Sequence, residues 1–174
     1  MTNDHARMYI DALATRLATD GCTVTTESWN GVPVLVGHRA DFRLRWMATK
    51  LHQLTIVAPT GTVSAGTIEQ FTEEAFTYAV ARKGQMRGLQ SGIAIFPTLV
   101  GTAVDPAAAA WARQQQRLRF ACMARPVTVD VSTGEVAAFR GRAALGALYA
   151  GHLRTKIDTY FPVGAGEGTR GVNR

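Results

Sequence analysis

The sequence predicts an α+β fold in which an antiparallel sheet packs against about four helices. Asn30-Gly31 stands between two β-rich runs, and residues 126–139 repeat such a hairpin pattern. Four further stretches carry apolar residues at helical spacing. The expected order of elements is α-β-β-β-α-β-α-β-β-α, and the first three strands should form a β-β-β meander.

The first helix is expected over residues 4–19 and should end at Gly21. Strands over 23–29 and 32–37 follow, joined by the Asn-Gly turn, because both turn positions need positive φ. Pro33 has no N–H to donate, so it should lie at an edge or at a strand start.

Residues 38–41 (HRAD) are expected to form a turn into a long strand over 42–59. Alternation in the first half of this strand places Arg43 and Arg45 on the solvent side. Continued alternation would turn Lys50 and His52 toward the core. A bulge or break near residues 47–50 would re-aim both side chains.

The second helix is predicted from Ser64 or Thr67 to Lys83, with Gly84 at its C-terminal end. The apolar run over 92–104 is typical of a strand buried on both faces, although Pro97 indicates a bulge or an edge there.

Asp105-Pro106 is an N-cap followed by proline at the first helical position, which predicts a third helix through 107–120. The second hairpin joins 126–131 to 135–139. Residues 143–160 have the clearest amphipathic pattern of the chain and predict the last helix.

A chain of 174 residues is expected to form one domain, here residues 1–163. Residues 164–174 (GAGEGTRGVNR) are rich in glycine and are expected to be a flexible C-terminal tail. The chain shows neither a signal-peptide pattern nor an apolar run long enough for a membrane span, so a cytoplasmic protein is expected.

No cofactor is expected from the sequence. Cys22 and Cys122 stand far apart without a CxxC motif or a Cys/His cluster, which favours two buried, reduced thiols over a zinc site. Neither a G-x-S-x-G nucleophile motif nor a phosphate-binding glycine loop occurs.

One enzymatic alternative is a degenerate, metal-dependent nuclease, because a helix, three antiparallel strands and a helix also open the restriction-endonuclease-like core. Such a site needs an acid on the second strand and an acid-x-lysine pair on the third. Asp41 and Lys50 could serve, but Ala48 stands where the second acid belongs, and Glu27 would have to replace it in space.

Basic residues form the best candidate binding surface. The net charge is +6, and 16 of the 19 basic residues are arginine, which binds phosphate and carboxylate with two hydrogen bonds. This surface, for an anion or a protein partner, consists of two basic clusters and the irregular position around Lys50. Its predicted residues are Arg43, Arg45, Lys50, His52, Arg82, Lys83 and Arg87.

The leading functional hypothesis is a non-enzymatic protein-binding or adaptor module that acts as a homodimer, because core-forming sequence is ample and no catalytic constellation stands out. By analogy of fold alone, the pattern resembles dimeric adaptor and secretion-chaperone-like domains. Binding of nucleic acid or another anion is the alternative. His152 and Lys156, four apart on the apolar side of the last helix, are boundary residues or part of an interface.

Overall fold

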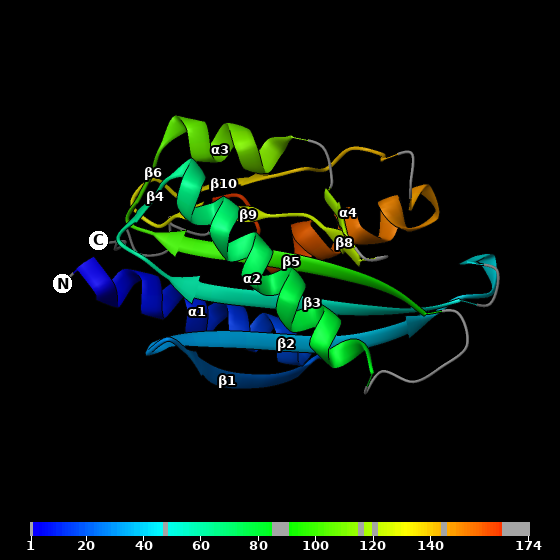
Figure 1. Cartoon of the computed structure of the whole chain (residues 1–174). Coiled ribbons are helices and arrows are strands. Elements are labelled where there is room, and N and C mark those ends of the chain that lie inside the picture. The colour runs from blue at the N-terminus through cyan, green and yellow to red at the C-terminus, as the bar shows by residue number, and fades with distance from the viewer. Residues whose placement is uncertain are drawn as a thin grey trace, which may run out of the picture.

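A central sheet lies between two layers of helices in the computed structural model of this chain (Figure 1). The structure describes residues 2–46, 49–84, 91–114, 117–119, 122–143 and 146–164. The α+β class and the order of the main elements are confirmed, and the short strands β4, β6, β7 and β8 are additional. Arg87 and residues 165–174 of the predicted tail lie outside the described residues.

The helices are α1 (Thr2–Thr19), α2 (Ala65–Lys83), α3 (Pro106–Arg113) and α4 (Ala150–Tyr160), with 3₁₀ turns η1 (Leu44–Trp46) and η2 (Ala147–Tyr149). The strands are β1 (Thr23–Trp29), β2 (Val32–Phe42), β3 (Lys50–Pro59), β4 (Thr62–Val63), β5 (Ser91–Gly101), β6 (Ala103–Val104), β7 (Arg117–Arg119), β8 (Cys122–Ala124), β9 (Val127–Asp130) and β10 (Glu135–Ala138). Among these residues, no helix is long and apolar enough to cross a membrane.

The predicted meander is β1-β2-β3, and both of its pairings are antiparallel. Asn30 and Gly31 have φ of 51° and 82°, as a two-residue hairpin turn of the mirror-image type requires. The expected turn at residues 38–41 is wrong, because β2 continues to Phe42. Beyond β2 the chain enters the 3₁₀ turn η1, and the predicted strand over 42–59 begins only at Lys50.

The sheet is mixed, because β5 runs parallel to β3. Helix α2 makes the crossover that parallel neighbours need, and Ser64 begins it with a capping box to Thr67. Pro97 lies inside this central strand, where the neighbour of β5 changes from β8 to β9. The carbonyl of Ile95, two residues earlier on the same edge of β5, accepts a hydrogen bond from the N–H of Arg125, which follows β8. The position where Pro97 lacks an N–H therefore faces the break between β8 and β9, and no sheet hydrogen bond is lost there.

Helix α3 is shorter than predicted. It ends at Arg113, because Gln114 takes an extended conformation, and residues 117–119 pair with β8 as an edge strand. The second hairpin, β9-β10, lies where the sequence predicts it. The last helix begins later than predicted, at Ala150, after the left-handed Gly146 and the turn η2.

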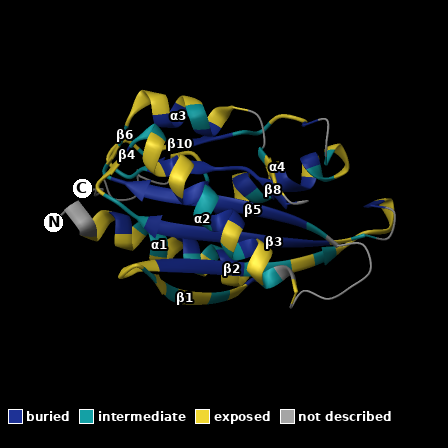
Figure 2. Cartoon of the chain, viewed as in Figure 1, coloured by how far each residue is buried: buried dark blue, intermediate teal, exposed yellow. Residues whose placement is uncertain are grey.

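Two apolar cores lie on opposite faces of the sheet, and the central strands β3 and β5 are buried on both (Figure 2). One core joins α1 and α4 to residues such as Leu51 and Phe96. The other core joins α2 and α3 to residues such as Leu54 and Ile95. The sheet therefore separates any functional groups on its α1/α4 face from those on its α2 face.

Candidate functional site

The sheet divides the predicted binding residues between its two faces. Cross-strand partners share a face, so Lys50, opposite Phe42, and His52, opposite Ala40, both point to the α2 face. Arg82 of α2 belongs to the same side. Arg43 instead approaches α4, with its Nη2 atom 3.5 Å from Nδ1 of His152. Arg45 is exposed in η1, and the structure does not describe the side chain of Lys83.

The end of β2 and the start of a new strand at Lys50 explain how Lys50 and His52 are oriented, which strict alternation over 42–59 could not. Lys50 is exposed at the first residue of β3, whereas His52 is only 6% exposed. His52 is stabilised there by a partner that sequence reasoning missed. That partner is His38 of β2, which stood in the supposed turn.

His38 and His52 form a stacked imidazole pair on the α2 face. Nε2 of His38 lies 3.1 Å from Nδ1 of His52, and the rings are 10° from parallel. Burial, with Arg82 and Lys50 nearby, lowers the pKa of His38. Burial, with His38 and Lys50, lowers the pKa of His52. One neutral imidazole therefore donates to the other near neutral pH.

Acidification is expected to destabilise the protein through this pair. A lowered pKa in the folded state means that the unfolded chain binds more protons, so folding stability falls as pH drops below the unfolded value of about 6.5. Each such histidine contributes a slope of at most about 1.4 kcal/mol per pH unit between roughly pH 7 and 5. Urea unfolding across this range should show a smaller slope for His52→Gln than for the wild type.

The matched control is His5→Gln, which removes an exposed imidazole from α1. Equal slopes for the wild type and His52→Gln would contradict the assignment of the buried pair. Asp20 and Asp41 do not confuse the measurement, because the pKa of both carboxyls is lowered and their titration falls at more acidic pH.

A second polar cluster, the acid–base network, lies on the α1/α4 face and joins three elements. It contains Asp20, Arg39, Asp41, His152, Lys156 and Tyr160. Oδ2 of Asp20 accepts hydrogen bonds from Tyr160 at 2.5 Å, from Lys156 at 2.6 Å and from Arg39 at 2.6 Å. Burial alone would raise the pKa of Asp20, but these donors lower it below its usual value.

Asp41 completes the acid–base network and is held by Arg39 through two hydrogen bonds of 2.8 and 2.5 Å. Nε2 of His152 lies 3.2 Å from its Oδ2, close enough for an ion pair but without hydrogen-bond geometry. Burial is the main reason that the pKa of His152 is lowered in spite of this carboxylate. The charges of the network thus neutralise one another, which suits a clamp between α1, β2 and α4.

The geometry of Asp41 bears on the nuclease alternative. The side chains of Asp41 and Lys50 point to opposite faces of the sheet, and the carboxylate of Asp41 forms an ion pair with Arg39. Across the described part of the chain, no three His, Cys, Asp or Glu side chains gather as a metal ion would require.

The most exposed predicted residues lie at the turn between β2 and β3. We call Phe42, Arg43, Leu44, Arg45 and Lys50 the β2–β3 tip. Leu44 is 82% and Phe42 57% exposed, and the three basic side chains are also exposed. None of the three forms an ion pair with a carboxylate of the described residues, in contrast to the arginines at 39, 82, 113, 119 and 140.

Trp46 anchors this tip to the body of the protein. It is 1% exposed and packs edge-on against Tyr149 at 5.1 Å and His152 at 5.0 Å. Arg43 lies over its ring at 5.3 Å. The exposed side chains of the tip therefore extend from a fixed base.

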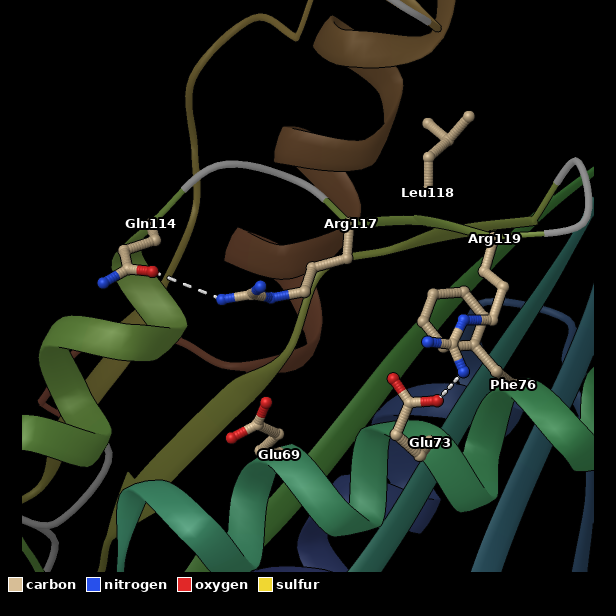
Figure 3. A pocket seen from close by; sticks show the side chains of 7 residues that line it. All are labelled: Glu69, Glu73, Phe76, Gln114, Arg117, Leu118 and Arg119. Carbon is tan, nitrogen blue, oxygen red and sulfur yellow. Dashed lines mark hydrogen bonds and ion pairs between the residues drawn. The ribbon is translucent and has the colours of Figure 1, made fainter.

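A groove of about 630 Å³ between α2 and β7 is the fourth candidate (Figure 3). Its charged side chains largely bind one another: Arg119 pairs with Glu73, and Arg117 donates to Gln114 at 3.2 Å and lies over Trp111. Leu118 points away from the glutamates. A ligand here would have to displace existing pairs, which makes the groove a weaker site than the tip.

Comparison with protein-family models and with curated proteins finds no match to this chain.

Proposed function

We propose that this chain is a non-enzymatic protein-binding domain, acting as a homodimer, that docks an acidic and partly apolar partner through the β2–β3 tip. One observation carries the proposal: the tip presents two strongly exposed apolar side chains among three basic ones that no described carboxylate neutralises.

The chemistry of the tip favours a protein partner. Protein interfaces combine apolar anchors with arginine, which binds carboxylates through two parallel hydrogen bonds. Leu44 and Phe42 supply the anchors, and Arg45 stands beside them. A nucleic acid would use the cations and could stack a base on Phe42, but the aliphatic side chain of Leu44, the more exposed of the two, offers no ring for stacking.

The other polar clusters support a binding role over catalysis. The carboxylates of Asp20 and Asp41 both form ion pairs with Arg39, and Asp20 also pairs with Lys156. A catalytic acid or base must reach a substrate, whereas Asp20 already accepts from three side chains and Asp41 from two N–H groups of Arg39.

Charge reversal at the tip is expected to abolish most of this binding. The probe is a fluorescent peptide of alternating glutamate and leucine, and fluorescence anisotropy measures its affinity. Arg43→Glu with Arg45→Glu should weaken binding by about 100-fold, roughly tenfold for each reversed contact. Leu44→Ser should weaken it by about tenfold, because the apolar anchor is lost. The control is Arg7→Glu, which reverses one exposed arginine on α1 and is matched in charge to the single variant Arg45→Glu, for which about a tenfold loss is expected.

Oligonucleotides of equal charge separate the two classes of partner. If single- or double-stranded DNA binds as tightly as the peptide, weakens steeply with salt and ignores Leu44→Ser, the tip is a nucleic-acid site and the proposal is wrong. Peptide binding that is indifferent to every change at the tip would also overturn it.

A further inference from the structure

We propose that the free edge of β1 is the homodimer interface, where two copies pair antiparallel and join their sheets into one. This inference rests on the homodimer part of the proposed function and names its surface. Among the described residues, β1 pairs only with β2 and forms one border of the sheet (Figure 1).

The hairpin geometry shows which backbone groups of β1 are free. Trp29 and Val32 flank the two-residue turn and so form a hydrogen-bonded pair. Alternation then directs the N–H and C=O of Thr23, Thr25, Glu27 and Trp29 toward β2. The same groups of Val24, Thr26 and Ser28 point to the open edge. Pro33 agrees with this phase, since it lies opposite Ser28 in a pair that exchanges no hydrogen bonds.

The edge of β1 lacks the devices that usually prevent pairing between sheets. Its seven residues, TVTTESW, contain no proline and no lysine, and β-branched residues dominate. The register with β2 is continuous and has no bulge. The opposite border is shared by two shorter strands: β7, with three residues of which two are arginine, and β10, with four residues that pair only with β9. Among the described strands, β1 is therefore the longest edge of the main sheet.

The one charge of β1 does not oppose a second copy. Oε1 of Glu27 accepts a hydrogen bond from Tyr78 at 2.6 Å and pairs with Arg82 at 2.5 Å on the α2 face. This neutralisation leaves the strand uncharged in effect.

The strand is complementary to itself about Thr26. A two-fold axis there sets Thr26 opposite its own copy, Val24 opposite Ser28 and Thr25 opposite Glu27, so no like charges face one another directly. Three free N–H groups on each of two strands make six hydrogen bonds across the axis. The occupant that fits this edge is a second copy of the chain.

A proline at the centre of the edge tests the interface. Thr26→Pro removes a free N–H without removing a bond to β2, so the protein should keep its circular dichroism spectrum and lose the dimer. Light scattering over a concentration series should show a dissociation constant raised at least about tenfold. Thr26→Val is the matched control, because it keeps the N–H and the β-branch, and it should dimerise as the wild type does.

Cysteine cross-linking tests the register. Thr26→Cys places two thiols on the axis and should give a disulfide-linked dimer under mild oxidation. Thr25→Cys, equally exposed and one residue away, opposes Glu27 of the second copy and should not cross-link. Cys22 and Cys122 are buried and do not compete.

The outcomes separate this inference from the proposed function. A wild type that stays monomeric at high concentration overturns the homodimer and the interface together. A wild-type dimer that survives Thr26→Pro and does not cross-link at residue 26 overturns the β1 interface alone. A wild type that dimerises through β1 but binds no peptide, or whose peptide binding ignores every change at the tip, overturns the docking site and leaves the interface standing.

Discussion

Asp20→Asn is expected to lower the free energy of unfolding by about 2–4 kcal/mol, because one carboxylate oxygen serves three donors. Asparagine keeps an acceptor oxygen but not the negative charge. Lys156 and Arg39, both largely shielded from solvent, would then face each other with less compensation. Urea unfolding monitored by tryptophan fluorescence measures the change.

Asp158→Asn is the matched control for Asp20→Asn. Asp158 also pairs with an arginine, Arg140 at 2.9 Å, but its side chain is 57% exposed. Exposed ion pairs contribute little, so this variant should stay within about 0.5 kcal/mol of the wild type. Similar small losses for both variants would mean that the acid–base network does not clamp α1 to α4.

Trp46→Ala should be the more damaging core substitution, with a loss of about 3–5 kcal/mol. The indole is almost fully buried and contacts Tyr149 and His152, so alanine leaves a cavity beneath the tip. Its Nε1 atom has no hydrogen-bond partner among the described residues. Trp46→Phe therefore removes packing alone and should cost about 1–2 kcal/mol. Denaturant midpoints of the two variants give the comparison.

Leu44→Ser distinguishes stability from binding at the same turn. Leu44 is exposed, so its replacement should leave unfolding within about 0.5 kcal/mol of the wild type while it weakens the peptide complex. If Trp46→Ala proves as mild as Leu44→Ser, then Trp46 does not anchor the tip.

Local chemistry explains which parts of the fold the sequence could predict. The Asn-Gly turn, the Ser64 cap and Asp105-Pro106 impose backbone conformations that need no distant partner, and all three lie where expected. Residues 38–41 look like a turn because they are charged. In the structure Arg39 binds Asp41 and Asp20, and Asp41 lies against His152 of α4, so tertiary contacts keep β2 extended.

The candidate site could be predicted only in part, for a similar reason. Alternation along the chain indicated that Lys50 and His52, two polar residues, would face the core. Only the register between β2 and β3 shows that His38 lies beside His52 on the same face and supplies a hydrogen-bond partner. The two polar residues on the apolar side of the last helix, His152 and Lys156, were the available signal for the acid–base network. Their partners, Asp41 for His152 and Asp20 for Lys156, lie more than a hundred residues away, which no local pattern reports.

The clamp between α1 and α4 has a consequence for synthesis of the chain. Its hydrogen bonds from Lys156 and Tyr160 to Asp20 join residues 136 and 140 positions apart. The ribosome therefore releases α1 well before the helix that completes its layer, and the sheet face around Leu51 and Phe96 stays partly open meanwhile. The α2 layer, formed between adjacent strands, can close much earlier, so the two faces of one sheet should mature at different times on the nascent chain.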